Sequence, residues 1–385
     1  MTDIQTAAQP LNELLNVAHD RPFSLLFANY SYLVGVAGAI FVIWALRFLI
    51  TRRLSLSEQF LALPLAVSLF IPGMVNVLLE LHQPGRILHG YLYGWDYLHT
   101  AFIKWAIFLL PSLLALIWWM MMQSVRDGLR QYWSSVPAPL RPVLELVTLG
   151  SRHYDLLHQT VGIILLCLGI VLGLFATAYS GLFLMSEHGI PFWNTPLVPL
   201  MFSLTAFGAA AGCYVALTPL LRLGTDLQPG EGCEHRWVML AVALLGGLLW
   251  IAWPWWLGHF GTVADQRALA LLHGPYSGSI MNQWILPGIL LPLVLLLLAG
   301  SLRWARVLAG LGLLYGAYTF RVIVVIGGQA LQRSGTGYLA YSPEHAVIID
   351  SILNLCFLLG WVGLLLWLLP MASATDKNPE PGEPS

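Results

Sequence analysis

The sequence of 385 residues predicts an all-α integral membrane protein, and two observations support that prediction. Hydrophobic residues make up 58% of the chain and charged residues only 10%, which lies far outside the range of soluble domains. The chain also contains apolar runs of about 20 residues, the length that crosses the hydrocarbon core of a membrane. We expect nine transmembrane helices, near 31–50, 58–80, 101–122, 159–184, 196–221, 237–257, 282–301, 304–327 and 347–370.

The orientation of these spans follows from the distribution of Lys and Arg. Of the 18 basic residues, twelve fall on one side of the membrane and six on or toward the other. Short loops that keep positive charge stay cytoplasmic. We therefore expect the N-terminus outside and the C-terminus inside, in agreement with an odd number of spans.

The expected helices divide into two four-helix bundles and one closing helix. We expect an outer N-terminal segment at 1–25, a first bundle at 26–185, a second bundle at 186–328, an outer loop with the ninth helix at 329–371, and a disordered cytoplasmic tail at 372–385. The inner loop 123–157 carries four Arg and is expected to form a short surface helix.

Polar residues gather at one level of the first four expected spans. The first span begins with Asn29 and Tyr30, and the fourth leaves past Tyr179. Residues 76–104, between spans two and three, hold the densest polar cluster: Asn76, Glu80, His82, Arg86, His89, Asp96, His99 and Lys104. Charge at a membrane boundary is costly and usually functional. We therefore expect a pocket near the outer surface.

The sequence offers no pattern typical of a bound metal centre. Its four cysteines stand apart, without a C-x-x-C motif or a close His partner, so we expect no iron–sulfur cluster and no metal site. No expected span holds two His at mid-depth, so we also expect no haem. Redox chemistry at this chain then needs cofactors that are held elsewhere.

The second bundle contains one unusual charge. Arg321 lies about two thirds of the way outward along the eighth span, at 1.5 Å per residue, and Asp350 lies in the first turn of the ninth. We favour a structural ion pair between Arg321 and Asp350 that locks span eight to span nine. The alternative is a catalytic role for the pair.

Three short motifs resemble those of the NrfD/polysulfide-reductase membrane subunits. They are Glu80-Leu81-His82-Gln83-Pro84-Gly85-Arg86 followed by His89, His273-Gly274-Pro275-Tyr276, and the stretch from Arg321 to Gly327-Gly328-Gln329. The last motif looks closest to hydrogenase membrane subunits of the same superfamily. The resemblance covers about residues 25–370. Relatives often carry an acidic residue before Leu-Gly-Arg-Pro, so Glu80 and His82 are both candidates for the role of that acid.

The resemblance implies a subunit without haem or cluster that binds quinone or quinol, either menaquinone or ubiquinone, in a bacterial inner membrane. It implies a ferredoxin-like iron–sulfur partner subunit on the outer side, which serves a molybdopterin or nickel–iron catalytic subunit. In such complexes the quinone site lies in the first bundle near the outer face. Nucleic acid has no place in this interpretation, and the remaining contacts are with membrane lipids.

The residue types suit quinol oxidation, which releases two electrons and two protons and needs a base. Glu80 or His82 would be that base, and Arg86 or Lys104 would stabilise the anionic reduced ligand. The other quinone-binding candidates are Asn29, Tyr30, Asn76, His99 and Tyr179.

Structural alternatives remain for these residues. Glu80 and Lys104 would then form an ion pair, Arg86 would contact lipid headgroups, and Tyr30 would belong to the interfacial aromatic belt. Asp96 and His99 would instead form a docking surface. Two other functions also stay open: a proton or ion translocator, which needs ionisable residues across the whole bilayer, and a pure membrane anchor.

Overall fold

The computed structural model describes residues 23–51, 56–81, 83–97, 102–154, 156–157, 159–221, 233–274, 276–330 and 344–376. Within these ranges every element is a helix or a turn, and nine helices are long and apolar enough to cross a membrane. The prediction of an all-α membrane protein with nine spans is therefore confirmed.

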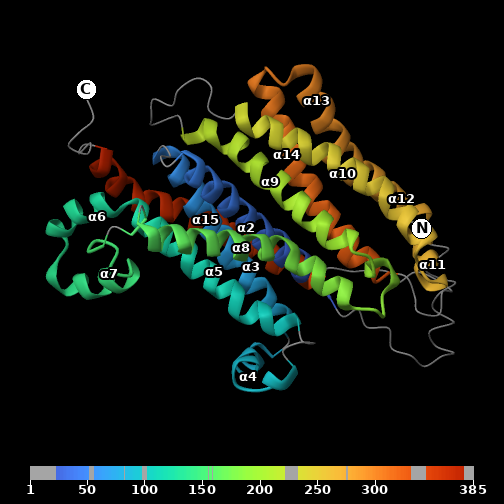
Figure 1. Ribbon diagram of the computed structural model, residues 1–385, viewed down its shortest axis with the longest axis horizontal. Coiled ribbons are helices and arrows are strands. Elements are labelled where there is room, and N and C mark those ends of the chain that lie inside the picture. Colours follow the sequence, from blue (N-terminus) through green and yellow to red (C-terminus); the bar gives the residue numbers. More distant parts are fainter. Residues whose placement is uncertain are drawn as a thin grey trace.

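The first bundle consists of α2 (Leu25–Thr51), α3 (Leu56–Glu80), α5 (Phe102–Ser124) and α8 (Thr160–Ser186). Each helix contacts its neighbours in the order α2, α3, α5, α8 and back to α2 (Figure 1). Helices α2 and α8 approach closely at Gly38, where an added Cβ would lie 2.9 Å from the carbonyl oxygen of Gly173. Small residues permit such approaches between membrane helices.

The second bundle consists of α9 (Leu197–Leu221), α10 (Cys233–His259), a broken seventh span and α14 (Arg303–Val322). The seventh span runs through α12 (Ser277–Ser279), the π-helix η6 (Ile280–Leu290) and α13 (Leu291–Ala299). Helix α14 continues into a second π-helix, η7 (Ile323–Gly327). Contacts of α2 with α9 and α14, and of α8 with α9, join the two bundles.

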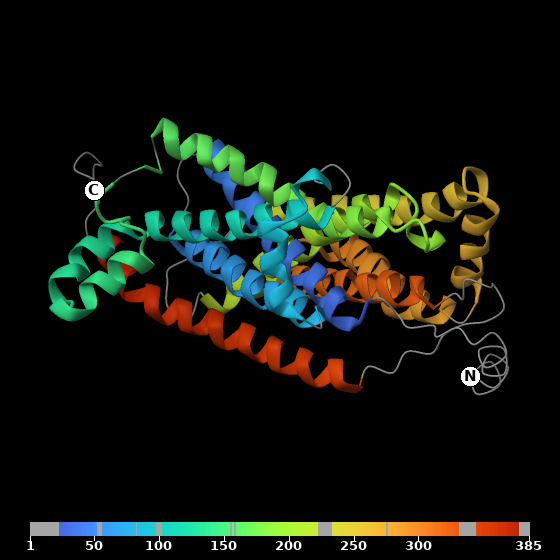
Figure 2. The same cartoon turned by 90° about the horizontal axis from the view of Figure 1, so that it is seen from below.

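The closing helix α15 (Glu344–Asp376) lies along one side of the first bundle, where Figure 2 shows it in red. It packs against α3, α2 and α6 (Arg126–Tyr132). In the most apolar stretch of α15 only 11% of residues are buried, against 72% in that of α2. This helix is therefore a peripheral addition to the first bundle.

Short helices cover the two ends of the molecule. At one end, η1 (Pro84–Arg86), α4 (Ile87–Leu92) and η2 (Trp95–Tyr97) follow α3, η5 (Pro191–Trp193) precedes α9, and α11 (Val263–His273) follows α10. At the other end, α6 leads into η3 (Trp133–Ser135), η4 (Ala138–Leu140) and α7 (Arg141–Val147). We name these the Glu80 end and the Glu145 end.

Candidate functional site

Glu80 is the last residue of α3 and caps the beginning of α2. One of its carboxylate oxygens accepts a hydrogen bond from the Ser24 backbone N–H at 2.6 Å, and the other accepts from the Ser24 hydroxyl. A carboxylate at this place satisfies an otherwise free N–H and faces the positive end of the helix dipole. Glu80 is therefore held in a defined position, half-buried at the membrane-boundary end of the bundle.

Two buried asparagines lie at the same end, one on α2 and one on α3. Asn76 is fully buried one turn before Glu80, and its amide nitrogen donates to the Pro72 carbonyl at 2.8 Å. Asn29 is 3% exposed in the second turn of α2. The side-chain oxygen of each asparagine has no hydrogen-bond partner among the described residues. Buried polar atoms without a partner cost free energy, so both oxygens are candidates for contact with a ligand.

Asp350 on α15 brings a second carboxylate to this site. Its side chain is within hydrogen-bonding reach of Asn29 and interacts electrostatically with Glu80. It is 6% exposed, and neither of its oxygens has a hydrogen-bond partner in the described part of the chain. Asn29, Glu80 and Asp350 thus interact with one another, and Asn76 lies on the same face of α3 as Glu80, four residues before it. We call these four residues the acceptor site.

Aromatic rings line the side of α2 that faces α8. The side chain of Tyr30 lies beside those of Tyr179 and Ser180, and its ring centroid is 5.8 Å from that of Phe27. Tyr179 in turn is 6.3 Å from Phe183. Tyr30 and Tyr179 are both buried, so they belong to the bundle interior rather than to an exposed interfacial belt.

The beginning of α2 is also tied to the end of the second bundle. The Gln329 side chain accepts from the Phe23 backbone N–H at 2.9 Å and donates to the Phe23 carbonyl at 3.0 Å. Trp193 donates from its indole nitrogen to the Val324 carbonyl in η7 at 2.7 Å. The same carbonyl also accepts the backbone N–H of Gly328, so the Trp193 bond uses its second lone pair. Gln329 of the Gly-Gly-Gln motif therefore positions the segment that carries Ser24.

Lys104 lies in α5 with its ammonium group already engaged. Its Nζ donates to the Tyr93 carbonyl at 2.5 Å and lies 4.3 Å from the centre of the Trp95 ring. No ion pair joins Lys104 to Glu80 in the described structure. The two residues therefore do not form the structural ion pair that the sequence left open as an alternative. Lys104 fastens the segment after α4 to α5, while Arg86 is exposed in η1.

Arg321 is fully buried in α14, and its partners differ from the predicted one. It donates to the Thr205 hydroxyl, the Phe202 carbonyl and the Ala317 carbonyl, each at 2.9 Å. The predicted ion pair with Asp350 is therefore wrong, because Arg321 turns toward α9 whereas α15 packs on the first bundle. Hydrogen bonds to neutral oxygens, rather than a carboxylate, satisfy most of this guanidinium.

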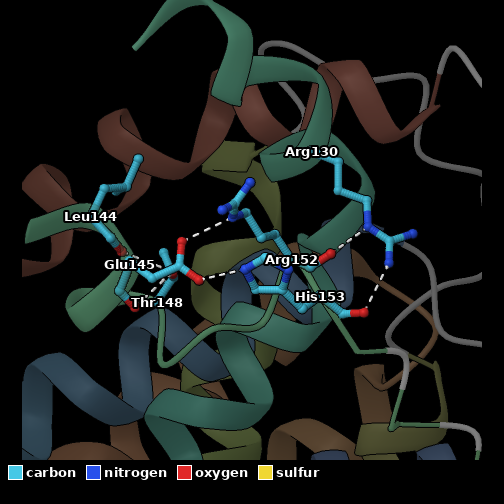
Figure 3. Close-up of polar contacts among 6 residues, drawn as sticks. All are labelled: Arg130, Leu144, Glu145, Thr148, Arg152 and His153. Atoms are coloured by element: carbon cyan, nitrogen blue, oxygen red, sulfur yellow. Dashed lines mark hydrogen bonds and ion pairs between the residues drawn. The ribbon is translucent and has the colours of Figure 1, made fainter. Parts of the chain in front are cut away.

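The loop 123–157 forms more than the single surface helix expected. It contains two helices, α6 and α7, and the segment after α7 folds back onto Glu145 of α7, whose two oxygens contact Arg152 Nε at 2.9 Å and His153 Nε2 at 2.7 Å (Figure 3). Arg130 donates to the Arg152 carbonyl at 2.5 Å. Arg152 also lies 3.8 Å over the Trp133 ring. Contacts between polar and charged side chains hold this unit together. The helix periodicity of the sequence does not predict them.

Two predicted site residues, His82 and His99, lie outside the described residues. The structure brings Asn29 and Glu80 to Asp350, and Tyr30 to Tyr179, while Asn76 lies one turn before Glu80 on α3. Sequence reasoning missed Ser24, named Gln329 only as part of a motif, and assigned Asp350 to the wrong neighbour. No group of three or more His, Cys, Asp or Glu suited to a metal is found in the described ranges.

Comparison with known families places this arrangement in context. The family model described as "Polysulphide reductase, NrfD" matches residues 13–332, and the chain belongs to this family. A search among curated proteins found no match. The chain is thus a multi-pass membrane subunit of a respiratory oxidoreductase complex, in a family whose members associate with iron–sulfur subunits.

Helix α15 stands apart in this comparison. The family match ends at residue 332, before Glu344, where α15 begins. Asp350 is therefore contributed by a helix outside the matched range, whereas Asn29, Asn76 and Glu80 lie within it.

Proposed function

We propose that this subunit binds quinone or quinol at the acceptor site and exchanges electrons between the membrane quinone pool and an iron–sulfur partner subunit. The observation that supports the proposal most is the set of buried, unpartnered oxygens on Asn29, Asn76 and Asp350 beside the held carboxylate of Glu80. Small-molecule sites combine a few placed polar groups with apolar walls, and the aromatic side chains near Tyr30 supply such walls.

The ligand supplies the redox chemistry: a quinol gives up two electrons and two protons when it is oxidised. The chain supplies hydrogen-bond partners and a base. Glu80 is the proton acceptor of this proposal, because its position is fixed by Ser24 at the membrane boundary. Asn29 and Asn76 orient the ring hydroxyls, and Tyr30 and Tyr179 flank the ring. His82 remains a second candidate base, and His99 and Arg86 remain candidate contacts.

We further propose that the Glu80 end faces the outside of a bacterial inner membrane, with the N-terminus outside and the C-terminus inside. The excess of Lys and Arg on the other side of the membrane supports this orientation. A ferredoxin-like partner would dock at the Glu80 end, receive the electrons and pass them to a molybdopterin or nickel–iron subunit. Menaquinone and ubiquinone both suit the site.

The complex purified with its partners tests this function. Reduced quinol is added, and reduction of the iron–sulfur clusters of the partner is followed by its optical change. We expect Glu80→Ala to abolish most of this reduction and Ser112→Ala, on the exposed face of α5, to leave it unchanged. If Glu80→Ala, His82→Ala and Lys104→Ala all transfer electrons at the wild-type rate, the site assignment is wrong. If the wild-type complex neither binds nor oxidises quinol, the chain is an anchor.

A further inference from the structure

The unpartnered atoms of the acceptor site share one chemical property. Asn29 Oδ1, Asn76 Oδ1 and both carboxylate oxygens of Asp350 lack partners. In their usual states all of these atoms accept hydrogen bonds, and an ionised carboxylate cannot donate one. No buried, unpartnered donor accompanies them at this end of α2, α3 and α15 in the described ranges. The site is therefore suited to a ligand that donates hydrogen bonds.

The orientation of Asn76 is fixed by its own hydrogen bond. Its amide nitrogen donates to the Pro72 carbonyl at 2.8 Å. A flip of the amide would place its oxygen against that carbonyl, with two acceptors facing each other. Asn76 therefore presents its oxygen, not its nitrogen, to the site.

The other charged groups near Asp350 do not supply the missing donors. Glu80, from α3, accepts hydrogen bonds from Ser24 and, as a carboxylate, has none to donate. Helix α2 offers the amide of Asn29, whose nitrogen is within hydrogen-bonding reach of the Asp350 carboxylate, and this still leaves the Asn29 oxygen and the second Asp350 oxygen in need of a donor. The charged residues of α6, which also packs on α15, lie at the Glu145 end, and His345 on α15 is exposed.

The two redox forms of the proposed ligand differ in the property that the site selects. A quinol carries two hydroxyl groups and donates two hydrogen bonds, whereas a quinone carries two carbonyl groups and donates none. Burial of an acceptor against another acceptor leaves both without a partner, which is costly away from water. A quinol relieves this cost, and a quinone increases it.

We propose that α15 completes the site through Asp350, and that the site so formed selects the hydroxyl-bearing quinol over the quinone. This inference rests on the proposed function and adds a specificity for one redox form to it. The site holds quinol more tightly than quinone, so quinol occupies it when both forms are present at equal concentration. When a quinol is oxidised at the site, it loses two electrons, passed one at a time to the iron–sulfur clusters of the partner, and two protons to acceptors at the site.

Binding of the two redox forms tests this selectivity without turnover. The probes are menadiol, kept reduced under anaerobic conditions, and menadione, each titrated calorimetrically into the intact complex in lipid nanodiscs. We expect menadiol to bind about tenfold more tightly than menadione, the effect of one well-formed hydrogen bond. By linkage, the midpoint potential of the bound couple then lies about 30 mV above that of the free couple for each tenfold preference.

The variant Asp350→Asn isolates the contribution of α15. It keeps the shape of the side chain but replaces an acceptor by an amide that also donates. We expect the preference for menadiol to fall to about equal binding, mainly because menadione binds more tightly. Asp350→Glu, which retains the carboxylate, is expected to keep the preference. The control Asn354→Ala, on the exposed face of the same helix, is expected to bind both probes as the wild type does.

The possible outcomes separate this inference from the function on which it rests. If neither probe binds the wild-type complex, the proposed quinone function fails. If both bind and menadione binds equally or more tightly, the function stands and the selectivity is wrong. If the wild type prefers menadiol and Asp350→Asn keeps the full preference, α15 does not form part of the site. A variant that fails to assemble leaves the wild-type ratio as the deciding measurement.

Discussion

The polar side chains at the two ends of the first bundle differ in whether their hydrogen-bonding atoms have partners. At the Glu145 end, the two oxygens of Glu145 contact Arg152 and His153, and Arg130 is bonded to two backbone carbonyls. At the Glu80 end, Asn29, Asn76 and Asp350 are more deeply buried yet keep unpartnered oxygens.

This difference separates structural from functional polarity. The Glu145 cluster joins segments of one loop, and its groups satisfy one another. The acceptor site joins three membrane-spanning helices and leaves its oxygens without partners, at a cost that only a ligand or the remaining residues can offset. Density of charge alone, which is greater along 123–157, does not identify the site.

The largest effect is expected at Glu80, where two variants separate its role as a base from its role as a cap of α2. Glu80→Gln keeps an acceptor for the Ser24 N–H but removes the base, so quinol-dependent reduction of the partner should fall about 10²-fold. The control Ser24→Ala removes one hydrogen bond to Glu80 and keeps the base. Stopped-flow measurement of cluster reduction distinguishes them, and equal losses in both variants would make Glu80 a purely structural cap.

The opposite result is expected for Glu145. Glu145→Gln removes its ion pair with Arg152 and weakens its contact with His153, so the free energy of unfolding should fall by about 1–2 kcal/mol while electron transfer is unchanged. Asp127→Asn, at a carboxylate that is 45% exposed against 32% for Glu145, should change stability by only about a few tenths of a kcal/mol. Thermal unfolding of the detergent-solubilised complex measures both. A slower quinol reaction in Glu145→Gln would show that the Glu145 end also contributes to electron transfer.

A substitution at Asn76 should raise stability and lower affinity together. Asn76→Leu replaces an unpartnered oxygen by apolar atoms of similar volume, so the ligand-free protein should gain about 1 kcal/mol of stability. Affinity for menadiol should fall about fivefold with the loss of one acceptor. The control Asn354→Leu, on the exposed face of α15, should change neither quantity. Lower stability in Asn76→Leu, with unchanged affinity, would show that Asn76 serves packing alone.

The smallest effect is expected at Lys104. Lys104→Met loses the contact with the Trp95 ring and the bond to the Tyr93 carbonyl, which should cost about 0.5–1 kcal/mol of stability. Trp95→Leu should reproduce most of that loss. Neither variant should alter the binding ratio of menadiol to menadione. A large change in that ratio for Lys104→Met alone would return Lys104 to the site.

Much of the fold could be predicted because membrane helices have a length and composition that a sequence displays directly. Nine spans were expected, and nine helices of suitable length and apolarity are found in the described residues. The packing of α15 could not be predicted in this way, because its apolar surface suits lipid and protein neighbours equally. Asp350 was therefore assigned to Arg321 on α14 instead of to the first bundle.

The site was predictable as a level in the membrane but not as a set of contacts. Span direction brought Asn29, Tyr30, Asn76, Glu80 and Tyr179 to one depth. Which atoms pair depends on partners distant in sequence: Ser24 lies 56 residues from Glu80, and Gln329 lies 306 residues from Phe23. A single sequence does not show which distant residues contact each other. Lys104 was placed at the site for the same reason.

The bonds between Gln329 and Phe23 have a consequence for biogenesis. During synthesis the first helix leaves the ribosome about three hundred residues before the side chain that fixes its beginning, and contacts of such sequence separation form late. The segment that positions Ser24 is thus secured only after both bundles have been inserted, and Asp350 arrives later still. A nascent or truncated subunit would lack a finished site, so under the proposed function partially made chains would not oxidise quinol.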